Sequence, residues 1–393
     1  MSITIGLAGK PNSGKSTFFK ASTMVDVEIA NYPFTTINAN KGVTFVRTEC
    51  QCTLLDKKCG NCIDGNRFIP INIIDVAGLV PDAHKGRGLG NKFLDELRQA
   101  QAIIHVIDAS GGTDIEGNPV KIGEHNPLDD IDFLNHEMSL WMFSILKRDW
   151  IKLSRKINAE GLKIEEIIAS KLLGAGVTEE QVHEALMECN FKNECTKWED
   201  KELMKLMFCL QRISKPMIIA ANKSDIAPKN YIEKLKQIEG IVVQTSAASE
   251  SALKTAAKIK VIKYLPGDLD FSIISDKLND AQKKGLESIH KFIKQNKGSG
   301  VQQCINKAVF GILGLIVVYP VEDEGKWIDK NERILPDAFL MKKNETVQDL
   351  AYHIHSDIGD CFLYAIDAKT KMRLGKKHIL KNGDVIKIVS TAK

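Results

Sequence analysis

The sequence lacks any long apolar run. None of its runs approaches the ~20 residues that a membrane-spanning helix needs. The first residues also lack the positively charged segment that opens a signal peptide. The cysteines are odd in number, nine, and they are scattered except for one cluster, so the sequence does not indicate a framework of disulfides. We therefore expect a protein of the cytoplasm with reduced thiols and no membrane partner.

Charge of one sign is not abundant either. The formal net charge of the 393 residues is only +4, and 26% charged residues is ordinary for a globular chain that can form two or three domains. The excess of basic residues lies in the C-terminal half of the chain. Residues 251–300 carry ten lysines and five acidic residues, and residues 337–393 carry ten basic and seven acidic residues. A mildly basic C-terminal half suits contact with RNA, but a solvated surface has the same composition.

A glycine-rich loop follows a predicted strand near the start of the chain. Residues 3–8 form a short apolar run, and residues 9–16 have the pattern Gly-x-x-x-x-Gly-Lys-Ser. Glycines let backbone N–H groups converge on phosphate oxygens, and the start of a helix adds unpaired donors. In such a loop Lys15 reaches the β- and γ-phosphates, and the Ser16 hydroxyl binds Mg²⁺. The expected nucleotide-binding residues of this loop are Gly9, Asn12, Ser13, Gly14, Lys15, Ser16 and Thr17.

Two further segments place polar groups at the ends of predicted strands. Residues 71–74 lead into Asp75, a carboxylate that suits Mg²⁺ through a water molecule, and then into Gly78, whose N–H can meet the γ-phosphate. Residues 216–221 lead into the sequence Asn222, Lys223, Ser224, Asp225. In this order the three segments predict an α/β fold with a P-loop G domain.

Asp225 is the residue that selects the base. Its carboxylate can accept hydrogen bonds from guanine N1–H and from the 2-amino group. Adenine has neither donor on that edge, so it would leave the carboxylate unpaired in a partly buried pocket, at a cost of about 1–3 kcal/mol. The sequence therefore favours GTP, with ATP as the alternative.

These segments resemble the Obg-like translation-factor GTPases, specifically the archaeal branch near YchF. Four segments carry the resemblance, at residues 9–17, 31–36, 75–80 and 86–94. The resemblance covers most of the chain. It implies that Thr36, or else Thr35, is the threonine whose hydroxyl joins Mg²⁺ when the γ-phosphate is present.

The same resemblance implies further contacts with the nucleotide. Asn12 would either help to bind a K⁺ ion beside the phosphates or only shape the loop. Ser246 and Ala247 match the last guanine-contacting loop, where a backbone N–H would meet guanine O6. YchF proteins proper favour ATP and lack the aspartate of the base-reading motif, whereas this chain has Asp225.

Position 79 departs from GTPases of the Ras type, which have a glutamine there that orients the attacking water. Leu79 has no polar group, so the water must be held by backbone groups, a K⁺ ion, a mobile residue or a partner. His84 is the side chain to test first, and the alternative is an ordinary exposed loop histidine. We expect slow hydrolysis, with the candidate catalytic residues Lys15, Thr36, Gly78 and His84.

Four cysteines form the one cluster, Cys50, Cys52, Cys59 and Cys62. Two closely spaced thiol pairs around a loop could hold a tetrahedral structural Zn²⁺. The gap between the pairs is short, and Cys-x-Cys is a less common ligand pair than Cys-x-x-Cys, so free or redox-labile thiols are the alternative. In either case we expect this loop to elaborate a hairpin.

The remaining pattern divides the chain into domains. We expect the G domain at 1–115 and 216–265, a helical insertion at 116–215, a connecting helical segment of the G domain at 266–320, and a β-grasp domain at 321–393. Apolar residues recur at helical spacing from 134 to 157. Residues 178–181 form a capping box that opens another helix, and a third helix spans about 198–213. His105, within an apolar run, is expected in the core.

The last part of the chain resembles a TGS domain, a small β-grasp module of several RNA- and ribosome-associated proteins. It is predicted as strand, helix, strand and strand, at residues 338–341, 347–356, 362–365 and 384–389. The leading hypothesis is therefore a monomeric, Mg²⁺-dependent GTPase switch that engages the ribosome or RNA. The rival is a regulatory ATPase without a nucleic-acid partner, and an inactive binding module is disfavoured because Lys15, Ser16 and Asp75 are all present.

Overall fold

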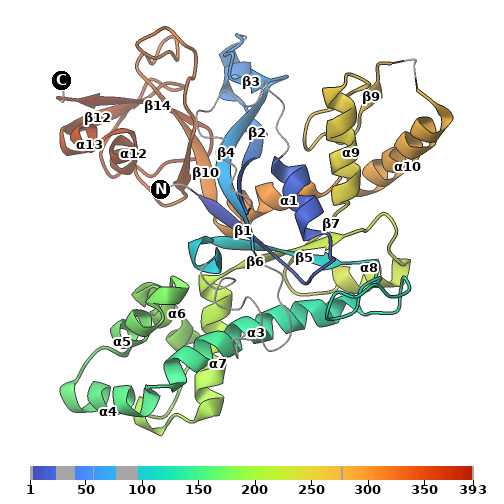
Figure 1. Ribbon diagram of the computed structural model, residues 1–393. Helices are drawn as coiled ribbons and strands as arrows, with labels where there is room; N and C mark the ends of the chain where they lie inside the picture. Colours follow the sequence, from blue (N-terminus) through green and yellow to red (C-terminus); the bar gives the residue numbers. More distant parts are fainter. Residues whose placement is uncertain (1–2, 24–39, 56, 77–95, 276–277, 392–393) are drawn as a thin grey trace. The chain divides into compact units, whose positions relative to one another are not determined.

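The computed structural model describes residues 3–23, 40–55, 57–76, 96–275 and 278–391. The chain, shown in Figure 1, forms two compact units. The first comprises Met1–Thr44 and Ile71–Ala308, and the second comprises Phe45–Pro70 and Val309–Lys393. The cysteine-bearing segment and the residues from 309 to 320 thus group with the C-terminal unit, whereas the sequence pattern had begun that domain at residue 321.

Buried parallel strands form the centre of the first unit. The sheet that contains them has the strand order β2-β4-β1-β5-β6-β7, with β3 paired antiparallel to β4. Strand β3 and the residues of β2 and β4 that fall within Phe45–Pro70 belong to the second unit. The pairs β1–β4, β1–β5, β5–β6 and β6–β7 are all parallel. Strands covered by helices on both faces must be apolar along their length, which accounts for the continuous apolar runs of the sequence. The strands are β1 (Thr4–Ala8), β2 (Lys41–Glu49), β3 (Cys62–Ile63), β4 (Asn66–Asp75), β5 (Ala102–Asp108), β6 (Met217–Asn222) and β7 (Ile241–Gln244).

Helices pack on both faces of this sheet (Figure 1). On one face α1 (Lys15–Thr23) contacts α9 (Ala247–Lys258), and on the other α3 (Pro127–Lys147) contacts α8 (Lys229–Lys236). Helix α11 (Val301–Asn306) packs against both α1 and β6. The predicted α/β P-loop fold is therefore confirmed.

A smaller element completes the first unit beside α9. The hairpin of β8 (Ile262–Lys263) and β9 (Ser272–Ile273) and the helix α10 (Asp280–Asn296) share a core with α9. Leu253 and Phe292 lie in that core. In the described ranges of the chain, no helix combines the length and the apolar character needed to cross a bilayer.

The predicted helical insertion lies between β5 and β6. Its helices after α3 are α4 (Trp150–Glu160), α5 (Ile164–Lys171), α6 (Glu179–Cys189) and α7 (Asp200–Ser214). The expectation of one continuous helix from 134 to 157 is wrong, because the chain breaks between α3 and α4. The break lets Trp150 turn into the insertion core, where it stacks on Trp198 with ring centroids 5.6 Å apart.

The second unit contains a five-stranded sheet in the order β11-β10-β14-β12-β13. Strand β10 pairs in parallel with β14 and antiparallel with β11. The predicted strands and helix of this region are confirmed, and the pattern had missed β10 and the two-residue β13. The elements are β10 (Leu315–Val321), β11 (Phe339–Lys342), α12 (Val347–Ile354), α13 (Ser356–Asp360), β12 (Phe362–Asp367), β13 (Arg373–Leu374) and β14 (Asp384–Ser390).

Candidate nucleotide-binding site and cysteine cluster

The predicted phosphate loop connects β1 to α1 at the carboxyl edge of the sheet. Gly14 has φ +91°, and a Cβ there would lie 2.2 Å from Nδ2 of Asn222. A Cβ at Gly9 would lie 2.3 Å from the carbonyl oxygen of Val106. Both positions therefore require glycine. The hydroxyl of Ser13 is buried in this loop without a hydrogen-bond partner among the described residues, which fits a donor that a phosphate oxygen would engage.

Lys15 and Ser16, at the start of α1, face Asp75 at the end of β4. The Lys15 ammonium forms an ion pair with one carboxylate oxygen of Asp75, and Ser16 Oγ lies 3.4 Å from the other. The structure thus brings together the three groups that the sequence assigned to Mg²⁺ and the phosphates. A hydroxyl and a carboxylate are oxygen ligands of the kind that Mg²⁺ prefers. Lys15 must leave Asp75 in order to reach a phosphate.

Asn222 connects the phosphate loop to the start of α9. Its Nδ2 donates to the Ser13 carbonyl oxygen at 3.0 Å, and its Oδ1 accepts the Ala247 N–H at 3.0 Å. Ser246 caps α9, because its hydroxyl accepts the Ser249 N–H at 3.2 Å. The Ser246 N–H itself donates to the Ser299 carbonyl at 2.9 Å. The N–H groups of Ser246 and Ala247, one of which the family resemblance implies as a donor to guanine O6, therefore both have partners within the protein, which O6 would have to share or replace.

Lys223 connects the base-reading loop to the phosphate loop. Its Nζ donates to the Asn12 carbonyl oxygen at 2.9 Å and to Asp108 Oδ2 at 2.8 Å. Burial disfavours the charged form of Asp108, but hydrogen bonds from Lys223 and Ser110 hold its pKa below the ordinary value. Asp225 is exposed rather than partly buried, so its carboxylate is accessible to a base.

A buried ion pair that the sequence did not suggest anchors the start of the phosphate loop. Lys10 Nζ lies 2.9 Å from Asp130 Oδ1 and donates to the Thr113 carbonyl oxygen at 2.8 Å, and the two charged side chains are each 2% exposed. His125 Nε2 lies 2.7 Å from the same carboxylate oxygen. Burial raises the pKa of Asp130, although Lys10 acts in the opposite direction. The partners are 120 residues apart, so no local pattern could have revealed them.

Three candidate catalytic residues, Thr36, Gly78 and His84, lie outside the described residues, as do Thr35 and Leu79. The proposed contact of Thr36 with Mg²⁺ stays a prediction. The same holds for the Gly78 N–H and for the role of His84 at the attacking water.

The cysteine cluster lies in the hairpin of residues 45–70, within the second unit. Cys50 directly precedes a short 3₁₀ helix, Gln51–Leu55, and Cys52 lies within that helix. Strand β3 pairs with β4 across the two-residue turn Asp64–Gly65, where φ is +47° and +77°. Two positive φ values are typical of a type I′ turn, which matches the twist of the paired strands. This hairpin confirms the expected local structure.

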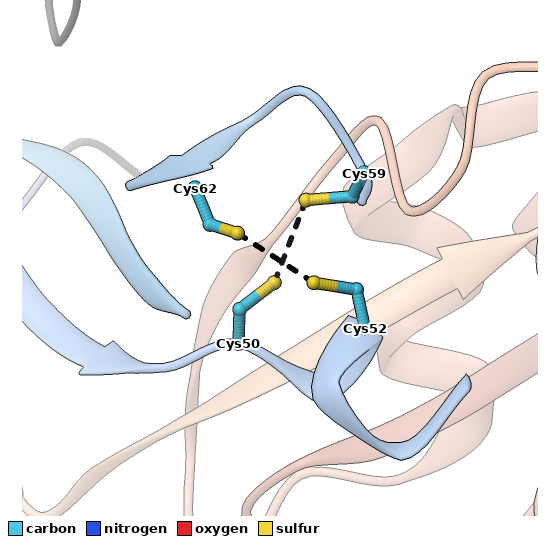
Figure 2. Close-up of side chains that lie close together, drawn as sticks. All are labelled: Cys50, Cys52, Cys59 and Cys62. Carbon is cyan, nitrogen blue, oxygen red and sulfur yellow. Dashed lines mark hydrogen bonds between the residues drawn. The ribbon is translucent and has the colours of Figure 1, made fainter. Parts of the chain in front are cut away.

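All four predicted cysteines converge, as Figure 2 shows. Their sulphur atoms lie within 4.8 Å of one another, and Cys50, Cys52 and Cys59 are buried. The sulphurs of Cys50 and Cys59 are 3.7 Å apart, and those of Cys52 and Cys62 are 3.5 Å apart. The hydrogen bond from Cys50 lowers the pKa of Cys59 to about 4, although burial acts in the opposite direction.

Three family models match the chain. The model described as 50S ribosome-binding GTPase matches residues 4–134. The model described as Obg-like GTPase YGR210-like, G4 motif-containing domain matches residues 220–323, and the TGS domain model matches residues 331–390. The matches include the phosphate loop, the base-reading loop and most of the C-terminal sheet.

Relatives extend the similarity over almost the whole chain. The chain is 50% identical to an uncharacterized GTP-binding protein of Methanocaldococcus jannaschii over 99% of both chains, and 30% identical to the ribosome-binding ATPase YchF of Bacillus subtilis over 98% of both. The crystal structure of a GTP-binding protein from Pyrococcus horikoshii is 38% identical, with a TM-score of 0.78 over 99% of this chain and 100% of that one. The chain therefore belongs to the YchF/Obg-like GTPase family and combines a P-loop G domain with a C-terminal TGS domain.

Proposed function

We propose that the protein hydrolyses GTP slowly and acts as a conformational switch on the ribosome or RNA in the cytoplasm. The observation that carries the proposal is the convergence of Lys15, Ser16 and Asp75, in one unit with a base-reading loop that ends in Asp225. The hydrogen bond between Asn222 and the phosphate loop joins these two parts directly. This connection supports one shared site for phosphates, metal and base.

The phosphate and metal ligands have separate roles in this proposal. Lys15 would stabilise the charge of the β- and γ-phosphates after leaving Asp75. Ser16 and Thr36 would coordinate Mg²⁺ directly, and Asp75 would do so through a water molecule. Ser13 would donate its unpartnered hydroxyl to a phosphate oxygen.

Hydrolysis is expected to be slow without a partner. The Gly78 N–H would hold the γ-phosphate, but Leu79 cannot orient the attacking water as a glutamine does. His84 is the proposed substitute. A switch with these properties stays in the GTP state until a partner completes the site.

A K⁺ ion beside the phosphates is a further part of the proposal. Asn12 Nδ2 donates to the Gly117 carbonyl oxygen at 3.0 Å, so the side-chain oxygen is the atom that would bind the cation. The hydrolysis rate should then be higher in KCl than in NaCl of equal ionic strength, and Asn12→Ala should remove the difference. Equal rates in both salts would contradict a K⁺ role.

GTP is preferred over ATP in this proposal because of Asp225. Relatives about 30% identical include proteins named as ATPases, whereas the relative at 50% identity is named as GTP-binding. A bound base would cover the exposed Asp225 carboxylate, and only guanine supplies the two donors that replace its lost water. We expect GTP to bind more tightly than ATP by about 10- to 100-fold.

Titration calorimetry with the full chain tests the base preference. Asp225→Asn should weaken GTP binding and strengthen binding of xanthosine triphosphate, because the amide of asparagine can donate to the carbonyl that replaces the 2-amino group. Asp280→Asn, an exposed aspartate on α10, is the matched control and should change neither affinity. Wild-type protein that binds ATP as tightly as GTP would contradict guanine selection.

The ribosome is proposed as partner because relatives and a matching family model are named for ribosome binding, and because the chain has a TGS domain. Co-sedimentation with ribosomes should depend on whether GDP or a non-hydrolysable GTP analogue is bound. Lys15→Ala, which impairs the phosphate site, should lose that dependence. Absence from the ribosomal pellet in every nucleotide state would favour the alternative, a regulatory nucleotide hydrolase without a nucleic-acid partner.

A further inference from the structure

The second unit holds a closed set of four sulphur atoms, separate in sequence from every nucleotide-binding segment. All four come from the hairpin of residues 45–70. We propose that Cys50, Cys52, Cys59 and Cys62 bind one Zn²⁺ ion tetrahedrally, and that this ion fastens the hairpin into the core of the second unit. The inference is independent of the proposed GTPase function.

The sulphur positions agree with a tetrahedron around zinc. A Zn–S bond of about 2.3 Å gives sulphur–sulphur edges of about 3.8 Å. The edges Cys50–Cys59 and Cys52–Cys62 measure 3.7 and 3.5 Å. In Figure 2 the two lines cross, as opposite edges of a tetrahedron do. All four sulphurs lie within 4.8 Å of one another, so the ligands would close around the ion by small movements.

The arrangement is less suited to disulfides. A disulfide joins two sulphurs at about 2.05 Å, and both close pairs here are well beyond that distance. Two disulfides also require only two separate pairs, whereas all four sulphurs lie within 4.8 Å of one another. One metal ion bound by all four sulphurs explains why the two pairs lie so close together.

The surroundings of the sulphurs suit a negatively charged metal–thiolate site. The Asn61 N–H lies 3.4 Å from Cys59 Sγ, and Gly60 between them has φ +72°. This backbone turn directs an N–H at a metal-binding sulphur, as outer-shell donors do in metal sites. Arg67, which pairs with Cys62 across β3 and β4, is only 3% exposed, and its guanidinium donates to the carbonyl oxygens of Leu335 and Pro336, which fastens this hairpin to the rest of the second unit.

The proposed ion would stabilise the conformation of the hairpin. Strand β3 has only two residues and pairs only with β4, so few backbone hydrogen bonds hold the segment that carries Cys59 and Cys62. Three of the cysteines share a buried core with Val317 and Tyr319 of β10, and the Tyr319 hydroxyl donates to the Glu49 carbonyl at 3.4 Å. Four metal–sulphur bonds would hold the hairpin in the conformation that this core requires.

The ligand set selects the metal. Four thiolates are soft ligands that favour Zn²⁺ or iron over Mg²⁺ and Ca²⁺. Four protein ligands leave no position for water or substrate, which is typical of structural zinc rather than catalytic zinc. We therefore infer a structural zinc.

Elemental analysis of the full chain, purified under reducing conditions without chelators, tests the proposal. We expect about one zinc per chain in the wild type. Cys59→Ser and Cys62→Ser should lose the ion, whereas Cys361→Ser in the same unit and Cys304→Ser in the first unit should keep it. GTP affinity, measured in each variant, reports whether the first unit is still folded.

Cobalt substitution tests the geometry without any mutation. The wild type loaded with Co²⁺ should show the visible absorption bands and sulphur-to-metal charge transfer of a tetrahedral thiolate complex. Iron in place of zinc in the purified protein would overturn the choice of metal. A protein that takes up no zinc on reconstitution, or whose mass is lower by four hydrogen atoms because of two disulfides, would overturn the site.

Discussion

Lys15 forms an ion pair with Asp75 in the present structure, whereas the proposed function requires it to contact a phosphate. In that proposal Asp75 would then face Mg²⁺, which would replace the lysine as its positive neighbour. The proposal therefore predicts that nucleotide and metal binding are coupled through these side chains. The sequence predicts Lys15 as a phosphate-binding residue, but it does not predict the ion pair of Lys15 with Asp75.

Replacing Lys15 by alanine should lower the single-turnover rate of GTP hydrolysis by about 10²- to 10³-fold, because one charged donor to the transition state is removed. Lys20→Ala, at an exposed position of the same helix, is the matched control and should leave the rate unchanged. Rapid-quench measurement with saturating nucleotide separates the chemical step from binding. A Lys15→Ala rate equal to that of the wild type would contradict the assigned role.

We expect His105 to make the first unit sensitive to acid. It lies in the middle of β5, 2% exposed, and burial lowers its pKa from 6.5 to about 3. The predicted core position is therefore confirmed. Below pH 6.5 the unfolded chain binds a proton at this histidine that the folded chain does not bind, so stability is fully present above that pH and is lost as the pH falls toward 3.

The free energy of unfolding should therefore fall by about 1.4 kcal/mol for each pH unit below 6.5 through this group. Urea unfolding at several pH values, followed by tryptophan fluorescence, measures the slope. His105→Gln should flatten it, whereas His136→Gln, at an exposed position on α3, should not. If the free energy of unfolding falls with pH at the same slope in both variants, groups other than His105 cause the acid sensitivity.

At the scale of single elements, sequence patterns that involve residues only a few positions apart agree well with the structure. Thr178 and Gln181 form the predicted capping box of α6, and Thr346 and Asp349 cap α12 in the same way. A cap is decided by neighbouring groups along the chain, so its sequence is sufficient. The sequence pattern did not reveal the break between α3 and α4, after which Trp150 stacks on Trp198, a residue far away in the sequence.

Thr178→Ala should destabilise the helical insertion by about 1 kcal/mol, because the N–H of Gln181 loses its side-chain acceptor. Thr178→Ser keeps the hydroxyl and should have little effect. Thermal unfolding followed by the fluorescence of Trp150 and Trp198 measures the difference. Equal stability of the alanine and serine variants would show that the cap does not contribute.

At the scale of the whole molecule, the chain combines two units with different means of stabilisation. The first has a buried parallel sheet covered by helices, whereas the second joins a five-stranded sheet to a hairpin that carries the proposed zinc. The cysteine hairpin precedes most of the first unit in the sequence, yet it groups with residues 309–393. Loss of the ion should therefore affect the second unit first.

Removal of zinc by a chelator, after release with a mercurial reagent and re-reduction, should raise amide hydrogen exchange in residues 45–70 and in the neighbouring β10. Exchange in α1, β5 and β6 should stay unchanged, and re-addition of Zn²⁺ should restore protection. Mass spectrometry of peptic fragments makes both measurements. Exchange that rises equally in both units would contradict a local structural role.

The sequence by itself determined the α/β class, the phosphate loop, and the positions of Asp75 and of the Asn222–Asp225 loop at strand ends, because each depends on residues that are adjacent or regularly spaced along the chain. Only the tertiary structure decided that Lys10 pairs with Asp130, that Lys223 bridges Asn12 and Asp108, and that the cysteines belong to the C-terminal unit. Those contacts join residues far apart in the sequence. Their formation depends on how buried surfaces pack, which no local pattern records.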